Sequence, residues 1–316
     1  MSHEISISIA EVKINFKSNE KEDIEAVEEI FSYHLVDKSV PSLFVHNVEI
    51  IERQDKLLLP NDLVRIWSGF VNTTMPIVWY NQASTKTSFI QIGNDILIKH
   101  FDDQNYTLCE LYEFSGGLFK KRKRPKLTIY LLFLIHSITS MYDRFCLHAC
   151  CLSKDGNALV FLGKSGAGKS TLSLMLGKKG FEYMGDDLVF VSDEGEQGLM
   201  IHSFVSKAKL LNSYSSTKRS IDIVKKNDLK YCFKSKLKSI IKLTPDHYKK
   251  DSLLTPESCD NVIGWLLTSS NNIAIQKNTD HWLELCYKAS TTIPAYNLLF
   301  GDKNAFDYSL IDNLYV

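Results

Sequence analysis

Residues 163–171 (GKSGAGKST) have the side chains and spacing needed to bind a phosphate chain. They complete the pattern G-x-x-x-x-G-K-[ST]. Glycines allow the backbone N–H groups to converge on an anion, and the N-terminus of a following helix adds positive potential. We expect Lys169 to contact the β- and γ-phosphates and the hydroxyl of Ser170 to bind Mg²⁺. The nucleotide-binding residues predicted in this way are Gly163, Ser165, Gly166, Ala167, Gly168, Lys169, Ser170 and Thr171.

A second group of chemically active side chains is the pair Asp186 and Asp187, some fifteen residues beyond the loop lysine. The pair lies in residues 182–191 (EYMGDDLVFV), ahead of a strand-like segment. Two neighbouring carboxylates suit phosphoryl transfer, because one can hold Mg²⁺ while the other accepts the proton of the attacking hydroxyl. An aspartate-rich turn without chemistry is the structural alternative.

His148 lies in residues 146–152 (CLHACCL), which predict a strand. Cys146, His148 and Cys150 would then share one face and suggest a metal site. At about 3.3 Å per residue, however, the outer two would be about 13 Å apart, too far to bind one ion. His148 is therefore either a core residue or a group directed at the neighbouring phosphate site.

Lys207 and Lys209 lie on one face of a strand predicted over residues 204–211. They could bring positive charge to a transferring phosphoryl group, or they could be solvated surface lysines. Residues 212–238 are polar and lysine-rich, and we expect them to form a mobile loop that covers the site.

The elements that must position these groups follow from hydrophobic patterning. Residues 158–162 (ALVFL) predict a buried strand after a turn at Asp155-Gly156, and residues 170–179 predict a helix that stops at Gly180. A long, largely buried helix is predicted over residues 126–145. Later elements are predicted at 260–269 (helix or strand), 281–289 (helix) and 293–300 (strand).

The N-terminal third predicts a small α+β domain. We expect one strand over residues 5–16, a helix over 23–34, further strands at 43–51, 77–80, 89–92 and 96–100, and a turn at 93–95. The basic run at 119–126 is interpreted as a linker between domains, and a nuclear-localisation signal is the alternative. The predicted domains are therefore residues 1–124, a docking domain for a substrate or partner, and residues 125–316, the nucleotide-binding domain.

The composition is that of a globular protein, with 316 residues, 44% hydrophobic residues, 23% charged residues and a formal net charge of zero. Zero net charge removes any global electrostatic argument for nucleic-acid binding. Seven cysteines without C-x-x-C spacing indicate reduced thiols. Neither a signal peptide nor an apolar run of about 20 residues is found, so a cytoplasmic protein without membrane contact is expected.

The order of His148, the glycine loop and Asp186-Asp187 resembles the kinase domain of the HPr kinase/phosphorylase family over roughly residues 130–200. The resemblance implies an α/β fold of the HPr kinase and phosphoenolpyruvate carboxykinase type. It also implies ATP and Mg²⁺ as cofactors, with Asp186 near the metal, Asp187 as general base and His148 beside the phosphoryl site.

The family's E-I-R-G-L-G-type signature is not found after residue 200, so the resemblance does not imply HPr as the substrate. Divergent members that lack it include the kinases of lasso-peptide precursors, which this chain resembles in length and in residues 293–300. The predicted function is phosphorylation of a serine in a peptide or protein, and a homo-oligomer is compatible with it. The alternatives are a kinase for a small hydroxyl compound, a loop NTPase switch and a nucleotide-binding partner protein without catalysis.

Overall fold

The structure is a computed structural model that divides into two compact units, Met1–Tyr142 (unit 1) and Asp143–Val316 (unit 2), and each is described by itself. The described residues are 2–71, 75–82, 84–112, 130–205, 208–211, 218–221, 223–246, 251–270 and 278–315. The predicted domain boundary at 124/125 and the predicted linker at 119–126 lie outside the described residues.

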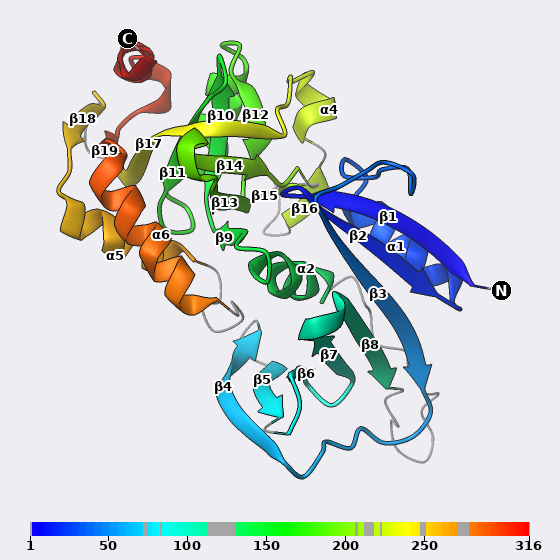
Figure 1. Ribbon diagram of the computed structural model, residues 1–316. Helices are drawn as coiled ribbons and strands as arrows, with labels where there is room; N and C mark the ends of the chain where they lie inside the picture. The colour runs from blue at the N-terminus through cyan, green and yellow to red at the C-terminus, as the bar shows by residue number, and fades with distance from the viewer. Residues whose placement is uncertain are drawn as a thin grey trace. The chain divides into compact units, whose positions relative to one another are not determined.

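Unit 1 is built on an eight-stranded sheet with the order β1-β2-β3-β8-β7-β6-β5-β4 (Figure 1). Its strands are β1 (His3–Ile9), β2 (Val12–Ser18), β3 (Phe44–Arg53), β4 (Leu63–Val71), β5 (Met75–Gln82), β6 (Thr87–Ile92), β7 (Ile96–Phe101) and β8 (Tyr106–Tyr112). Its helices are α1 (Lys21–Ile30), α2 (Leu131–Ser140) and the 3-10 turn η1 (Asp102–Gln104). Strands β2 and β3 are parallel, and α1 provides the crossover that a parallel pair requires.

The sequence predictions for unit 1 need three corrections. The strand predicted over 5–16 is a hairpin of β1 and β2, because Ala10 and Glu11 turn the chain with φ of 50° and 65°. The strands β4 and β8 were not predicted. The helix predicted over 126–145 is α2, which ends at Ser140 because Asp143 has a φ of 56° and Phe145 already pairs as a strand. The turn at 93–95 between β6 and β7 is confirmed.

Unit 2 is built on a nine-stranded sheet that contains the path β12-β10-β11-β17-β14-β13-β9. Strand β17 pairs with β14 through its first residues and with β19 through its last ones, and β18 pairs with β19. The strands are β9 (Phe145–Leu147), β10 (Cys150–Lys154), β11 (Asn157–Leu162), β12 (Glu182–Gly185), β13 (Val189–Asp193), β14 (Leu199–Ser203), β17 (Lys234–Pro245), β18 (Leu253–Pro256) and β19 (Ala295–Phe300), with a separate pair β15 (Ala208–Leu211) and β16 (Lys218–Ile221).

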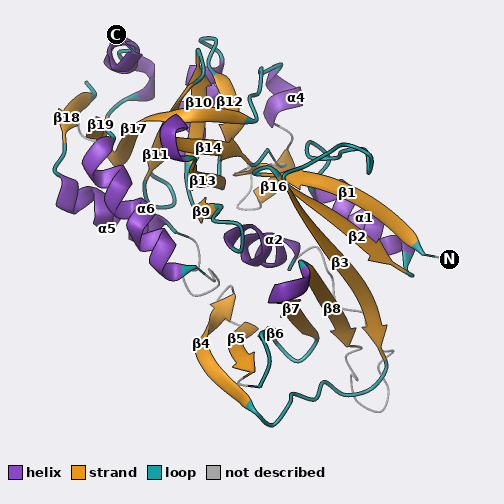
Figure 2. Ribbon diagram, viewed as in Figure 1, coloured by secondary structure: helices purple, strands orange, loops and turns teal. Residues whose placement is uncertain are grey.

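The helices of unit 2 cover both faces of this sheet (Figure 2). They are α3 (Lys169–Gly177), α4 (Ile223–Asn227), α5 (Cys259–Ser269), α6 (Thr279–Thr292) and α7 (Ser309–Asp312), with the 3-10 turns η3 (Gly195–Gln197), η5 (Lys303–Ala305) and η6 (Asn313–Tyr315). Alternate residues of β11 enter two cores: Val160 packs with α5 and α6, whereas Phe161 packs with α3. Burial on both faces explains the unbroken apolar run of this strand.

Three predictions for unit 2 are wrong in detail. Of the strand predicted over residues 204–211, only Ala208–Leu211 (β15) is a strand among the described residues. The strand predicted over 146–152 is interrupted, because β9 ends at Leu147 and β10 begins at Cys150. The mobile loop predicted over 212–238 contains β16, α4 and the start of β17 among its described residues. The two-residue turn Asp155-Gly156 between β10 and β11 and the strand of residues 293–300 are confirmed. Residues 260–269, predicted as either a helix or a strand, form a helix. Among the described residues, no helix has the length and apolarity to span a membrane.

Candidate active site

The predicted phosphate loop joins β11 to α3, so the motif has the strand and the helix that its chemistry requires. Helix α3 begins at Lys169, and Gly168 is its N-cap with a φ of 98° and no side-chain cap. A positive φ at this position favours glycine. A Cβ on Gly168 would also lie 3.1 Å from the ring of Phe300, so the loop packs tightly against β19. The uncapped N–H groups of the first turn are therefore suited to bind an anion.

Lys169 is buried at the base of the loop, with 7% of its surface exposed. Its Nζ donates to the carbonyl of Gly163 at 2.7 Å and to that of Lys164 at 3.4 Å. Nζ also lies 3.5 Å from Nε2 of His148. These contacts fix the ammonium group inside the curve of the loop, where it can meet the charge of a phosphate chain.

His148 lies in the break between β9 and β10, and its backbone N–H donates to the carbonyl of Ser269 at 2.6 Å. Burial and the neighbouring Lys169 lower the pKa of His148, while Asp187 opposes this shift through its charge and a backbone hydrogen bond. His148 therefore interacts with both Lys169 and Asp187. A neutral imidazole in this place can accept or donate a hydrogen bond without adding positive charge.

Asp186 follows β12 directly and is buried, with 6% of its surface exposed. The hydroxyl of Ser173 donates to its Oδ1 at 3.4 Å, and the hydroxyl of Ser170 also donates to the carboxylate. Burial raises the pKa of Asp186, and the charge of Asp187 adds to this shift, whereas Ser170, Ser173 and Lys169 lower it. The carboxylate and the motif serine thus form one oxygen-rich group.

Asp187 is exposed although its neighbour is buried. The chain is tightly packed just before the pair, because a Cβ on Gly185 would lie 2.5 Å from the carbonyl oxygen of Leu188. Glycine at this position leaves room for that oxygen where the chain bends between β12 and β13. A solvent-accessible carboxylate beside the loop could accept a proton from an incoming hydroxyl group.

The residues that would hold ATP and Mg²⁺ fit those groups chemically. The uncapped start of α3 and Lys169 suit the phosphates, and the hydroxyl of Ser170 with the carboxylate of Asp186 supplies the hard oxygen ligands that Mg²⁺ prefers. The carboxylate of Asp186 is buried among hydroxyl groups and has no basic partner within salt-bridge distance in the described part of the chain. Such an arrangement would gain from a bound cation.

The remaining sequence candidates lie apart from this group. Lys207, and the side chain of Lys209, fall outside the described residues, so their predicted phosphate contacts stay predictions. Within the described residues, Cys146, His148 and Cys150 do not form a group of three ligand atoms within 4.8 Å of one another. The three residues do not share one strand, so the distance argument made for an extended segment does not apply to them.

Two residues at the site were missed by sequence reasoning. Ser173 binds Asp186 and lies three positions after Ser170, so both serines share one face of α3. Gly185 precedes the aspartate pair, and its importance comes only from the closeness of Leu188 in space. The helical spacing of the two serines was visible in the sequence, whereas the close approach at Gly185 was not.

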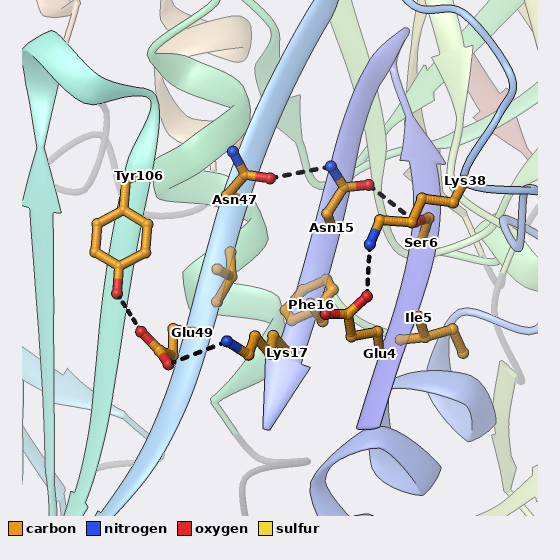
Figure 3. A pocket seen from close by; sticks show the side chains of 11 residues that line it. Glu4, Ile5, Ser6, Asn15, Phe16, Lys17, Lys38, Asn47, Glu49 and Tyr106 are labelled. Atoms are coloured by element: carbon orange, nitrogen blue, oxygen red, sulfur yellow. Dashed lines mark hydrogen bonds and ion pairs between the residues drawn. The ribbon is translucent and has the colours of Figure 1, made fainter. Parts of the chain in front are cut away.

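Unit 1 contains a pocket of about 250 Å³ (Figure 3). It lies on strands β1, β2, β3 and β8. Its polar side chains satisfy one another: Lys38 pairs with Glu4 at 2.5 Å, and the hydroxyl of Tyr106 donates to Glu49 at 2.7 Å. Because its charges are already paired, this pocket does not present a reactive group to a ligand.

No protein-family model matches the chain, and no curated protein matches it. Among solved structures, the chain is similar to the HPr(Ser) kinase/phosphatase from Coxiella burnetii, with 19% sequence identity and a TM-score of 0.32. The alignment covers 54% of this chain and 93% of that chain.

Proposed function

We propose that this chain is a Mg²⁺-dependent kinase that transfers the γ-phosphoryl group of ATP to a serine hydroxyl of a peptide or protein. The observation that carries the proposal is the pairing of a buried and an exposed carboxylate next to the phosphate loop. Asp186 is bound to hydroxyl groups of α3, and Asp187 is close to His148. Phosphoryl transfer needs both a metal ligand and a proton acceptor at one place.

The two aspartates have separate roles in this proposal. Asp186 and Ser170 would hold Mg²⁺, which neutralises phosphate charge when it is bound. The carboxylate of Asp187 would accept the proton that the serine hydroxyl loses as it attacks. Lys169 would stabilise the charge on the transferring group, and His148, with its lowered pKa, would stay neutral beside it.

The exposure of Asp187 supports a peptide or protein acceptor over a small molecule. Sites for small molecules bury most of the ligand in a cavity. Asp187 is open to solvent, so a serine on an extended peptide could reach it without entering an enclosed space. A ribosomally made peptide precursor is one acceptor of this class.

The experiment is a transfer assay with γ-labelled ATP, Mg²⁺ and a library of serine-containing peptides, followed by mass spectrometry of the labelled products. We expect phosphoserine in a subset of peptides, and no transfer when alanine replaces the labelled serine. Release of free phosphate without peptide labelling would favour an NTPase switch. Label found only in small hydroxyl compounds added as competitors would favour the small-molecule kinase.

A further inference from the structure

A second feature of the loop region is a pocket at the carboxyl ends of three parallel strands. Strands β11, β17 and β19 run parallel, with β17 between the other two. The phosphate loop follows β11, Pro245 ends β17, and residues 301–303 follow β19. In open α/β sheets, ligands bind outside the carboxyl ends of the strands.

The pocket has a volume of about 410 Å³ and meets the loop at Gly166, Ala167 and Gly168. This volume is within the range of small-molecule sites. Its other lining residues are Thr171, Pro245, Phe300, Gly301, Asp302 and Lys303. The pocket is lined by neither aspartate of the catalytic pair nor by His148, so it adjoins the phosphate loop without adjoining the proposed base.

The walls of the pocket combine apolar and polar surfaces. Pro245 and Phe300 supply apolar surface, and the ring of Phe300 is held by Phe306, with centroids 5.5 Å apart. Asp302 is exposed, and its Oδ1 accepts from the backbone N–H of Asn304 at 2.9 Å. That bond orients the carboxylate and occupies one of its two oxygens.

We infer that this pocket binds the nucleoside half of the nucleotide whose phosphates the loop would hold. The base would pack on Pro245 and Phe300, and the carboxylate of Asp302 would accept a hydrogen bond from a ribose hydroxyl. The inference rests on the proposed function, because the loop must first fix the phosphates. A pocket that meets the loop but not the proposed base suits the part of the nucleotide farthest from the transferred group.

The test compares binding of ATP and of inorganic tripolyphosphate, both with Mg²⁺, by calorimetry. The wild-type chain is expected to bind ATP at least about tenfold more tightly than tripolyphosphate. Asp302→Asn should weaken ATP binding about fivefold to tenfold and leave tripolyphosphate binding unchanged, because a neutral amide is a weaker acceptor than a carboxylate.

Asp307→Asn is the matched control. Asp307 accepts from the backbone N–H of Ser309 at 2.9 Å, as Asp302 does from Asn304, but it does not line the pocket. The Asp307→Asn variant should bind ATP and tripolyphosphate with the affinities of the wild type. Equal wild-type affinities for ATP and tripolyphosphate, or an equal loss of both in Asp302→Asn, would overturn the inference and leave the proposed function standing. Failure of the wild type to bind either ligand would overturn both.

Discussion

Asp186 and Asp187 are adjacent in the chain but differ in burial and in partners. Asp186 is enclosed by β12 and α3, with hydrogen bonds from Ser170 and Ser173. Asp187 is exposed and interacts with His148 through its charge and its backbone. A buried carboxylate surrounded by hydroxyl groups is suited to a cation, and an exposed one is suited to proton transfer. This difference in environment supports the separate roles that we propose for the two side chains.

The first prediction concerns the proposed base. Asp187→Asn should lower the rate of phosphoryl transfer by about 100-fold or more, because an amide cannot accept the proton. Its affinity for MgATP should stay within about twofold of the wild type, since the backbone and Asp186 are unchanged. Single-turnover kinetics and calorimetry measure the two effects. An unchanged transfer rate would show that the base is another group.

The sequence predicted the composition of this site more fully than its geometry. The loop and the aspartate pair could be proposed from the sequence because both are defined by residue types at short spacing. The burial of Asp186 and the exposure of Asp187 could not be predicted in this way, nor could the close approach of the Leu188 carbonyl to Gly185. Contacts of this kind are set by packing and have no short sequence pattern.

At the scale of elements, strand β17 shows how a strand can be mistaken for a loop. Residues 234–238 (KSKLK) were predicted to belong to a mobile loop because their composition is charged and polar. In the structure Lys236 is exposed, whereas Ser235 and Leu237 on the opposite face are buried. The alternation of exposed and buried residues, and not the charge content, was the correct signal.

The connection between β12 and β13 gives the second prediction. Gly185→Ala should lower the free energy of unfolding by about 1–3 kcal/mol, because the new Cβ would lie 2.5 Å from the carbonyl oxygen of Leu188. MgATP affinity should fall as well, since Asp186 must move. Denaturant unfolding and calorimetry provide the two measurements.

Gly264→Ala in α5 is the matched control for this substitution. A Cβ at Gly264 would meet no atom within 4 Å, and alanine favours a helix over glycine. It should raise the free energy of unfolding by about 0.5–1 kcal/mol and leave nucleotide binding unchanged. If Gly185→Ala and Gly264→Ala changed the free energy of unfolding and the MgATP affinity equally, the close approach described at Gly185 would be contradicted.

At the scale of the whole molecule, the sheet in unit 2 carries a polar network whose members are buried or partly buried. The hydroxyl of Ser192 is 2.8 Å from Nε2 of His202. Glu194 interacts with His202 at 3.5 Å, with Lys234 at 2.8 Å and with Arg144 at 3.8 Å. Burial lowers the pKa of His202 to about 3, and the charges of Arg144 and Lys234 contribute to the shift while Glu194 opposes it.

The third prediction is a loss of stability in mild acid. Below a pH of about 6.5 the unfolded state protonates this histidine, whereas the folded state keeps it neutral until about pH 3. The free energy of unfolding should therefore fall by about 2 kcal/mol between pH 7 and pH 5 through this group. Urea unfolding of wild type and His202→Gln measures the slope. A slope that is the same in both proteins would show that His202 does not contribute.

The central claim is that the phosphate loop and Asp186 form one site for a metal-bound nucleotide. The most direct measurement is ATP affinity with and without Mg²⁺ in the wild type and in Asp186→Asn. We predict that Mg²⁺ strengthens ATP binding to the wild type by at least about tenfold and that Asp186→Asn loses most of this gain. The claim would be contradicted if the wild type bound ATP equally well with and without Mg²⁺. It would also be contradicted if Mg²⁺ strengthened ATP binding to Asp186→Asn as much as it does in the wild type.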